Sequence, residues 1–501
     1  MKILLVYPKY PDTFWSFKHA LRFVFKKATN PPLGLLTVAA MLPKKWKKRL
    51  VDLNVSGLKD KDLEWADYVF ITAMTVQKES VRAIIARANK AGVKVVAGGP
   101  LFTSGYEDFD NVAHFVLNEA EITLPQFIKD LENGNALHVY ASNQWADLKD
   151  TPAPMLSLVN MKKYATMNVQ YSRGCPFNCD FCDITALYGR VPRTKSREQI
   201  IRELENLYKA GWRGDVFFVD DNFIGNKRKL KTDILPEIIK WMNKRRHPFA
   251  FYTQGSIELS DDEELMRLMA EAGFDTVFVG IETPDENSLH ECSKMQNKNR
   301  DLISSVKRIQ QFGMQVQAGF IVGFDSDPLT IFERQIRFIQ KSGIVTAMVG
   351  LLNAIRGTKL YHRLKNEGRL VKNATGDNTD CSINFIPKMH YETLIEGYKN
   401  VLATIYAPKH YYERVKTFLR EYRPAKRKGP RMNFRHVAAF FSSVVCLGVL
   451  GRERLYYWKL FFWTMFKRPN LLPQAITFAI YGYHFRKVFE RFALKPALQA
   501  A

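Results

Sequence analysis

Apolar and polar positions along the chain alternate in a way that predicts two α/β units, one after the other. Short runs rich in Val, Ile and Phe indicate buried strands, and the amphipathic segments between them indicate helices. In residues 1–141 we therefore expect a doubly wound sheet. Its predicted strands are Ile3–Tyr7, Arg49–Asn54, Tyr68–Met74, Val93–Ala97 and Ala113–Leu117, and its clearest helices are Gly34–Met41 and Lys78–Ala91.

The second unit, residues 166–353, repeats a strand and a helix six times, which is typical of a parallel sheet with crossover helices. A linker over residues 142–165, with Pro152 and Pro154, separates the two units. The predicted strands of the second unit are Asn168–Tyr171, Asp215–Val219, Ala250–Gln254, Thr276–Ile281, Gln315–Val322 and Val345–Leu351.

After residue 353 the pattern becomes mainly helical. Residues 354–422 predict a helical domain in which Asn384–Pro387 is extended, and residues 423–501 form a basic, aromatic-rich tail that opens with the hinge Arg423–Arg431. The longest uncharged apolar run, Val437–Leu450, is shorter than the ~20 residues that span a bilayer. Since MKILLVYP also lacks a cleavage site, we expect neither a transmembrane helix nor a signal peptide.

The charge is concentrated in the tail. The chain carries 74 Lys and Arg against 50 Asp and Glu, a net charge of +24, and the part from Lys409 to Ala501 alone has 19 against 4. Such an excess faces nucleic acid or a membrane surface. With no nucleic-acid motif, and with Trp458 and Trp463 among many aromatic residues, an anionic membrane is the favoured partner and nucleic acid is not expected. The alternative is a helical cap whose aromatic side chains are core.

Three of the six cysteines, Cys175, Cys179 and Cys182, share the spacing CxxxCxxC. The other three are scattered, so a disulfide framework does not fit. Zinc is the alternative, but structural zinc sites use four ligands and no second pair follows. Three thiolates instead favour an iron–sulfur cluster with one iron left open.

The segment YSRGCPFNCDFCDI, with Phe181 before the last cysteine, resembles the signature of the radical S-adenosylmethionine (SAM) enzymes. The resemblance implies a 4Fe-4S cluster on the three cysteines, a partial (β/α)6 barrel, an external one-electron reductant, and SAM bound near Phe181. Polar residues do follow the predicted strands, where parallel sheets collect their chemistry. By resemblance these hold SAM, although each acid could instead cap the next helix; they are Asp220, Asp221, Gln254, Glu282 and Gly323.

A Rossmann-like domain with PPLG, AGGP and NEAEITLP directly before the cysteines resembles the cobalamin-binding radical SAM family over roughly residues 1–400. The stretches YPDTFWSFKHAL and GFIVGFDSDP look most like its hopanoid C-2 methylase subgroup. Glycines after the fourth strand let a ligand approach the backbone, although a plain turn would need them too. The residues expected at cobalamin are Met74, Thr75, Gln77, Gly98, Gly99 and Pro100.

The sequence departs from the pattern of cobalamin proteins that bind cobalt through a histidine. The motif DxHxxG is absent, because His19 is followed by Ala-Leu-Arg and lacks the Asp two positions before it. We therefore expect no histidine below the corrin, and the loop that starts at Met74 should approach that face.

The resemblance implies a cobalamin-dependent C-methyltransferase that methylates an unactivated carbon of a membrane lipid, with a polycyclic triterpenoid of the hopanoid kind as one such substrate. No side chain is assigned a catalytic acid or base role. Two alternatives remain: the same cofactors used for a non-methylating rearrangement or ring formation, and a non-enzymatic cobalamin or redox sensor. The expected location is cytoplasmic, at the inner face of the membrane.

Overall fold

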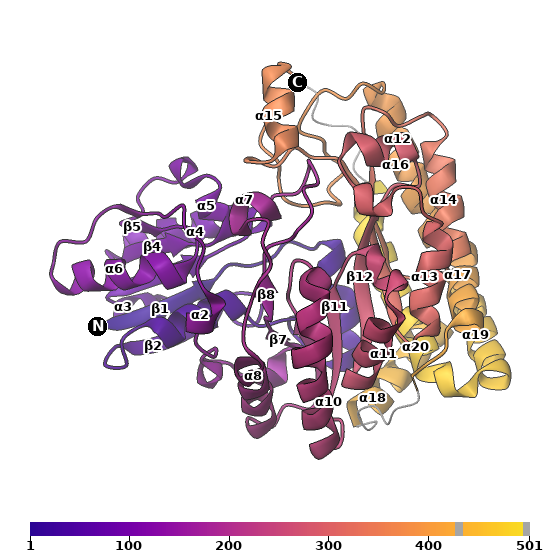
Figure 1. Ribbon diagram of the computed structural model, residues 1–501, viewed down its shortest axis with the longest axis horizontal. Helices are drawn as coiled ribbons and strands as arrows, with labels where there is room; N and C mark the ends of the chain where they lie inside the picture. Colours follow the sequence, from indigo (N-terminus) through magenta and orange to yellow (C-terminus); the bar gives the residue numbers. More distant parts are fainter. Residues whose placement is uncertain (426–433, 494–501) are drawn as a thin grey trace.

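The computed structural model describes residues 1–425 and 434–493 and contains two parallel six-stranded sheets, each in its own α/β unit (Figure 1). The N-terminal sheet has the order β2-β1-β3-β4-β5-β6. Its strands are β1 (Lys2–Tyr7), β2 (Lys47–Asp52), β3 (Tyr68–Thr72), β4 (Lys94–Gly98), β5 (His114–Val116) and β6 (Val139–Tyr140). Its helices are α1 (Lys18–Leu21), α2 (Leu33–Met41), α3 (Asp60–Trp65), α4 (Lys78–Lys90), α5 (Pro100–Thr103) and α6 (Ala120–Glu132).

The five predicted strands of this sheet are confirmed, and β6 is an addition of two residues. Both faces of the sheet are buried: Leu4 and Val6 of β1 face one apolar cluster, while Ile3 and Leu5 face another. A parallel strand covered on both sides needs a continuous apolar run, which is what β1 has. The strand order reverses at β1, so the loops after β1 and β3 border the crevice where such sheets bind ligands.

The second sheet has the order β14-β13-β12-β11-β10-β7, all parallel, and confirms the six predicted strands. Its strands are β7 (Met167–Val169), β10 (Gly214–Phe218), β11 (Phe249–Gln254), β12 (Phe274–Glu282), β13 (Gln315–Val322) and β14 (Ala347–Leu351). The helices of this unit are α7 (Ile184–Tyr188), α8 (Arg197–Lys209), α9 (Lys227–Lys229), α10 (Leu235–Lys244), α11 (Glu263–Ala272), α12 (Glu286–Glu291), α13 (Leu302–Gln311) and α14 (Ile331–Ser342). A short antiparallel pair, β8 (Ser172–Arg173) and β9 (Arg193–Thr194), brackets the cysteine segment and was not predicted.

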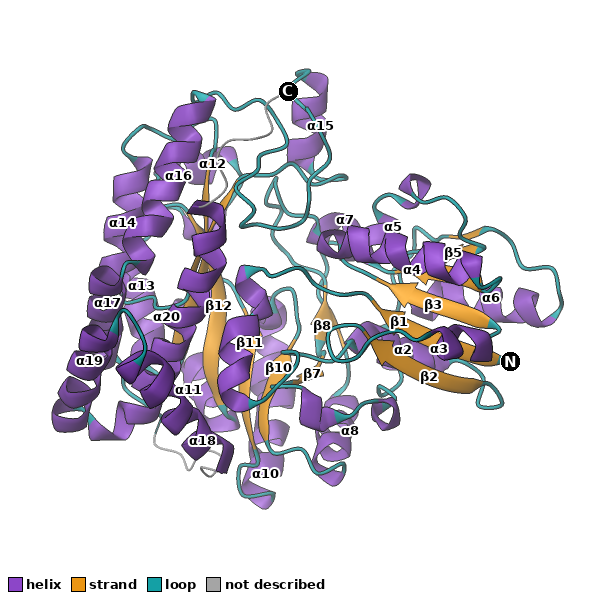
Figure 2. Cartoon of the chain, turned by 180° about the vertical axis from the view of Figure 1, so that it is seen from behind, coloured by secondary structure: helices purple, strands orange, loops and turns teal. Residues whose placement is uncertain are grey.

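The region after β14 is helical as predicted, apart from the isolated bridge between Leu370 and Phe385. Most of its helices cover the side of the barrel away from the N-terminal sheet, whereas the first of them lies on the side toward that sheet (Figure 2). They are α15 (Lys359–Asn366), α16 (Tyr391–Tyr406), α17 (Pro408–Glu421), α18 (Phe434–Ser443), α19 (Arg454–Lys467) and α20 (Leu472–Ala493). No helix among the described residues has both the length and the apolar run that a membrane span requires.

Much of the tail belongs to the core. Tyr457 of α19 and Phe485 of α20 are at most 1% exposed, and Phe485 stacks on Phe14 of the loop after β1 with ring centroids 4.2 Å apart. His484 Nε2 lies 2.9 Å from the Phe14 carbonyl oxygen. The helical-cap interpretation therefore holds for these aromatic residues. Most of the basic hinge, residues 426–431, lies outside the described residues.

Candidate active site

The cysteine segment runs from β8 to β9 and is folded tightly on itself. The Cys182 amide donates to the Cys179 carbonyl at 3.2 Å, and the Cys175 amide donates to the Gly189 carbonyl at 3.3 Å. Gly174 has φ 92°, and a Cβ there would lie 2.8 Å from the Val191 carbonyl oxygen. Only glycine fits this position, which turns the chain into the first cysteine.

Asp220 and Asp221, which follow β10, hold the backbone that leads into this segment. The fully buried Asp220 carboxylate accepts from the amide and the hydroxyl of Ser172 and, at 3.3 Å, from the Tyr171 amide. Asp221 accepts from the Gly174 amide at 2.9 Å. Burial raises the pKa of Asp220 to about 7 and that of Asp221 to about 6. The two acids expected at SAM thus bind the chain's own cysteine loop.

The three cysteines fit an iron–sulfur cluster by their donor chemistry. Among the described residues, no three His, Cys, Asp or Glu side chains stand ready as a metal-binding group, so the sulfurs would draw together on binding. Amide donors already face two of them: Asn222 Nδ2 lies 4.0 Å from the Cys175 sulfur, and Gln296 Nε2 lies 3.7 Å from the Cys179 sulfur. Such N–H···S contacts suit cluster thiolates. Burial raises the pKa of the Cys175 and Cys182 thiols, so cluster binding would release their protons.

Glu282 ends β12 in an unusual conformation and forms a buried ion pair. Its φ of 63° lies in the left-handed region, at a β-bulge against β13, a strain of about 1–3 kcal/mol for a non-glycine residue. Its Oε1 lies 2.8 Å from Lys294 Nζ, and a Cβ on Gly280 would collide with the same oxygen. Burial opposes the charge of Lys294, but the Glu282 carboxylate holds its pKa above the usual range. Sequence reasoning missed Lys294, because no periodicity marks it.

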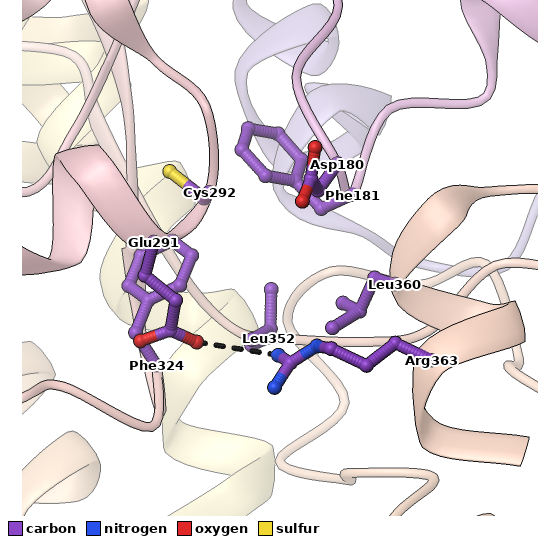
Figure 3. A pocket seen from close by; sticks show the side chains of 8 residues that line it. All are labelled: Asp180, Phe181, Glu291, Cys292, Phe324, Leu352, Leu360 and Arg363. Atoms are coloured by element: carbon purple, nitrogen blue, oxygen red, sulfur yellow. Dashed lines mark hydrogen bonds and ion pairs between the residues drawn. The ribbon is translucent and has the colours of Figure 1, made fainter. Parts of the chain in front are cut away.

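Phe181, predicted at SAM, lines one small hollow between the cysteine segment and the strand ends, and so does Phe324, the neighbour of the predicted Gly323 (Figure 3). Phe181 and Phe324, the residue after Gly323, face each other across it with ring centroids 6.3 Å apart. An ion pair of 3.3 Å between Arg363 and Glu291 lies at its edge. The hollow is lined by Asp180, Phe181, Glu291, Cys292, Phe324, Leu352, Leu360 and Arg363.

Backbone contacts fix the other predicted strand ends. Gly323 has φ 104°, and its amide donates to Asp327 Oδ2 at 2.8 Å. Gln254 is the last residue of β11, and just beyond it Asn222 Oδ1 accepts from the Ser256 amide at 3.2 Å. Asn222 therefore ties the end of β10 to the end of β11, beside the Cys175 sulfur.

The residues predicted at cobalamin lie at the crevice of the N-terminal sheet. Buried Gln77 donates to the Pro8 carbonyl at 2.6 Å and accepts from the Met74 amide, so it fastens the loop after β3 to the loop after β1. Met74 is 52% exposed. The chain itself crowds Thr75, because a Cβ on Gly376 would lie 2.9 Å from the Thr75 Cβ.

Packing alone accounts for the two glycines after β4. A Cβ on Gly98 would collide with the Val116 carbonyl oxygen, and one on Gly99 with the Thr72 hydroxyl. Pro100 begins α5. His19 is buried in α1, with its ring 5.6 Å from that of His484.

An aromatic face of the barrel sheet is turned toward the N-terminal loops. Along β12, Val277 and Val279 are buried, while Phe278 between them is half-buried on the opposite face. On this face Phe217 and Tyr252 stack at 4.5 Å, and the Tyr252 hydroxyl contacts Asn30. The rings of Phe217, Tyr252 and Phe278 give this face flat, mainly apolar surfaces.

Trp15, from the loop after β1, closes this face. Its ring meets Phe278 edge-on at 5.4 Å, and its Nε1 donates to the Met348 sulfur at 2.9 Å. The aromatic face therefore lies between the barrel and the N-terminal unit.

Three family models match the chain in succession: a B12 binding domain over residues 27–128, the radical SAM superfamily over 169–339, and a domain of unknown function (DUF4070) over 358–495. Over 490 residues the chain is 40% identical to an uncharacterized methyltransferase of Synechocystis sp., covering 97% of this chain and 91% of that one. It is 33% identical over 470 residues to the hopanoid C-2 methylase of Rhodopseudomonas palustris, covering 91% and 88%.

Two solved structures share the fold across both units. TsrM from Kitasatospora setae, a radical SAM methyltransferase with cobalamin and a [4Fe-4S] cluster bound, superimposes with a TM-score of 0.61 at 13% identity, covering 98% of this chain and 99% of that one. The cobalamin-dependent radical SAM enzyme OxsB, with aqua-cobalamin and SAM bound, gives 0.61 at 15% identity, covering 98% and 80%.

Proposed function

From the premise that this chain belongs to the cobalamin-dependent radical SAM methyltransferases, we propose that it methylates an unactivated carbon of a polycyclic membrane lipid. Its cofactors are a 4Fe-4S cluster, SAM and cobalamin, and it needs an external one-electron reductant. When bound, the cluster and SAM supply the radical and cobalamin supplies the methyl group. The lipid is our inference from the similarity to a hopanoid methylase and from the aromatic face.

The aromatic face is the observation that carries the choice of substrate. Phe217, Tyr252, Phe278 and Trp15 offer flat apolar surface between the two cofactor-binding units. A fused-ring hydrocarbon gains about 25 cal/mol for each Å² of apolar area that such a surface covers. Hydrogen abstraction from an unactivated carbon needs no acid or base beside the substrate, which suits a surface built mainly from aromatic rings.

The test is lipid mass spectrometry of cells with and without the gene. We expect one class of polycyclic lipid to lose a single methyl unit when the gene is deleted and to regain it on complementation. Unchanged lipids, with a methylated metabolite lost from the water-soluble fraction instead, would contradict the proposal.

For SAM we propose Phe181 and Gly323 at the adenine, in the hollow of Figure 3, and Gln254 and Glu282 toward the ribose and amino group. The apolar faces of Phe181 and Phe324 suit contact with a planar base. Asp220 and Asp221 would act on SAM through the cysteine loop that they hold.

For cobalamin we propose the crevice bordered by Met74, Thr75, Gln77 and the Gly98–Pro100 turn, with no histidine on the cobalt. Exposed Met74 lies at the point where the sheet order reverses, and His19 packs against α20. The corrin would then face the barrel across Trp15.

We also propose that the protein is cytoplasmic and rests on the anionic inner face of the membrane through α18 and α19. Of the nineteen exposed large apolar side chains in the described part of the chain, eight lie between residues 437 and 466. These eight residues form a tail stripe: Val437, Phe441, Val445, Val449, Leu450, Leu455, Phe462 and Phe466.

The tail stripe has the spacing and the charged neighbours of an interfacial surface. Its first four members recur every four residues along α18 and the π-helix Val444–Val449 that continues it, which places them on one side of this helical segment. Exposed Arg452, Arg454, Lys459 and Lys467 lie within the same segment. Each cation near an anionic leaflet contributes about 1 kcal/mol, and each inserted Phe adds about 1.5–3 kcal/mol.

Vesicle flotation tests this proposal with point variants, because removing the tail would uncover the core side of α20. On vesicles of phosphatidylglycerol and phosphatidylcholine, Phe441→Ser with Phe466→Ser should stop flotation. The matched control, Val191→Ser with Leu329→Ser, changes two equally exposed side chains elsewhere and should still float. Equal flotation of both double variants would contradict the assignment.

A further inference from the structure

Four charged side chains with little exposure join the N-terminal unit to the segment that carries the cluster cysteines. Glu119 and Glu121 stand at the start of α6, while Arg173 in β8 and Arg193 in β9 flank the cysteine segment. The side chains of the two glutamates are 0% and 5% exposed, and those of the two arginines 12% and 15%. Such burial is unusual for charged residues at a domain boundary.

The four groups balance in charge, with two carboxylates against two guanidinium groups. Arg173 donates to Glu119 at 3.0 Å and to both oxygens of Glu121 at 3.0 and 2.8 Å. Arg193 donates to both oxygens of Glu119, at 3.0 and 2.7 Å. Bidentate pairing of this kind fixes direction as well as distance.

The same glutamates also hold the linker between the two units. Glu119 accepts from the Ala146 amide at 2.7 Å, and Glu121 accepts from the Thr151 hydroxyl at 2.7 Å. Burial opposes the ionisation of Glu121, but its bonds to Arg173 outweigh it and lower its pKa to about 2. Both carboxylates therefore reach across to parts of the chain that meet only in the folded protein.

Each end of this network lies close to a predicted cofactor. Arg173 is two residues before Cys175, Asp221 holds the Gly174 amide between them, and Asp220 holds Ser172 just before Arg173. At the other end, α6 follows β5, which pairs with β4 and its Gly98–Pro100 turn. A shift of the glutamates relative to the arginines would shift one cofactor relative to the other.

We infer that Glu119 and Glu121 are positioning residues that set the separation between the cobalamin and the iron–sulfur cluster. The inference rests on the cofactors of the proposed function and is independent of the substrate. Isosteric Glu→Gln changes keep the volume but remove the charge that the two arginines need, so the cysteine segment would lose its fixed orientation.

Electron paramagnetic resonance of the holoenzyme, with Co(II) cobalamin and a reduced cluster, measures the separation directly through the dipolar interaction of the two spins. We expect one defined interaction in the wild type and a weaker, broadened one in Glu121→Gln and in Glu119→Gln. Methylation of cob(I)alamin by SAM, which releases S-adenosylhomocysteine, should also slow by about 100-fold, the effect of misplacing reactants by about 1 Å. Neither readout needs the lipid, so a failure of this inference can be told apart from a failure of the substrate proposal.

Glu132→Gln, on the same helix but paired with Lys45 at the surface, is the matched control and should behave as wild type. Arg173→Lys keeps the charge and loses the bidentate fork, so it should show a partial effect. This variant replaces the glutamate variants as the test if one of them fails to fold. Wild-type dipolar interaction and methylation in both glutamate variants would overturn the inference. So would loss of the cluster with cobalamin methylation intact, since the network would then serve the cysteine loop alone.

Discussion

Replacing Asp220 by Asn should change how the stability of the protein depends on pH. The Asp220 carboxyl is fully buried, with a pKa raised to about 7 from 3.8. A raised folded-state pKa means that the folded form keeps its proton longer than the unfolded form. Stability from this group is therefore complete below about pH 4 and is lost as the pH rises to about 7.

The magnitude follows from the size of the shift. Each pKa unit corresponds to about 1.4 kcal/mol, so the full loss is about 4 kcal/mol, of which about 2.5 kcal/mol falls between pH 5 and pH 8. Asn carries no charge at any pH and avoids this loss. It does lose about 1–3 kcal/mol at every pH, because its amide nitrogen cannot accept from the Tyr171 or Ser172 amides.

Urea denaturation followed by tryptophan fluorescence at pH 5 and pH 8 measures both contributions. Asp220→Asn should be less stable than the wild type at pH 5, and the gap should close by about 2.5 kcal/mol at pH 8. Asp110→Asn, at an exposed position, is the control and should keep a constant difference. A wild-type minus Asp220→Asn difference that stays the same at both pH values would refute the reasoning.

Three further predictions concern the cofactors. Replacing any one cluster cysteine by Ala should abolish the roughly 400 nm absorbance of the reconstituted cluster and SAM cleavage; bound zinc without cluster absorbance in the wild type would contradict the assignment. Glu282→Gln leaves Lys294 charged and unpaired, so the variant should lose about 3–5 kcal/mol of unfolding free energy and bind SAM more weakly; unchanged SAM affinity on calorimetry would make Glu282 a structural residue only. Electron paramagnetic resonance of Co(II) cobalamin should show no splitting of the cobalt signal by a nitrogen ligand. Splitting that disappears in His19→Ala would show that His19 coordinates cobalt and would contradict the prediction.

The sheets were predictable because most of their strands carry apolar runs, as expected for strands covered on both faces. The strands β6, β8 and β9 were missed, since each has only two residues, too few to show a period. Asp220 and Glu282 stand at strand ends as the pattern indicated, but their partners depend on tertiary contacts: the Ser172 amide for one and Lys294 for the other. In the tail, apolar residues occur all around α19, so the sequence could not separate buried Tyr457 from the exposed tail stripe.

The stacking of Phe14 on Phe485 has a consequence for how the protein is made. The two rings are brought together by residues about 470 positions apart, as the contact of His484 with Phe14 shows. At roughly 5–20 residues per second, translation needs about 25–95 seconds between the two. During that interval Phe14 lacks the ring of Phe485, while Trp15 of the same loop meets Phe278 and Met348 as soon as those residues are made. The order of synthesis therefore makes α20 the last element to dock on the loop after β1.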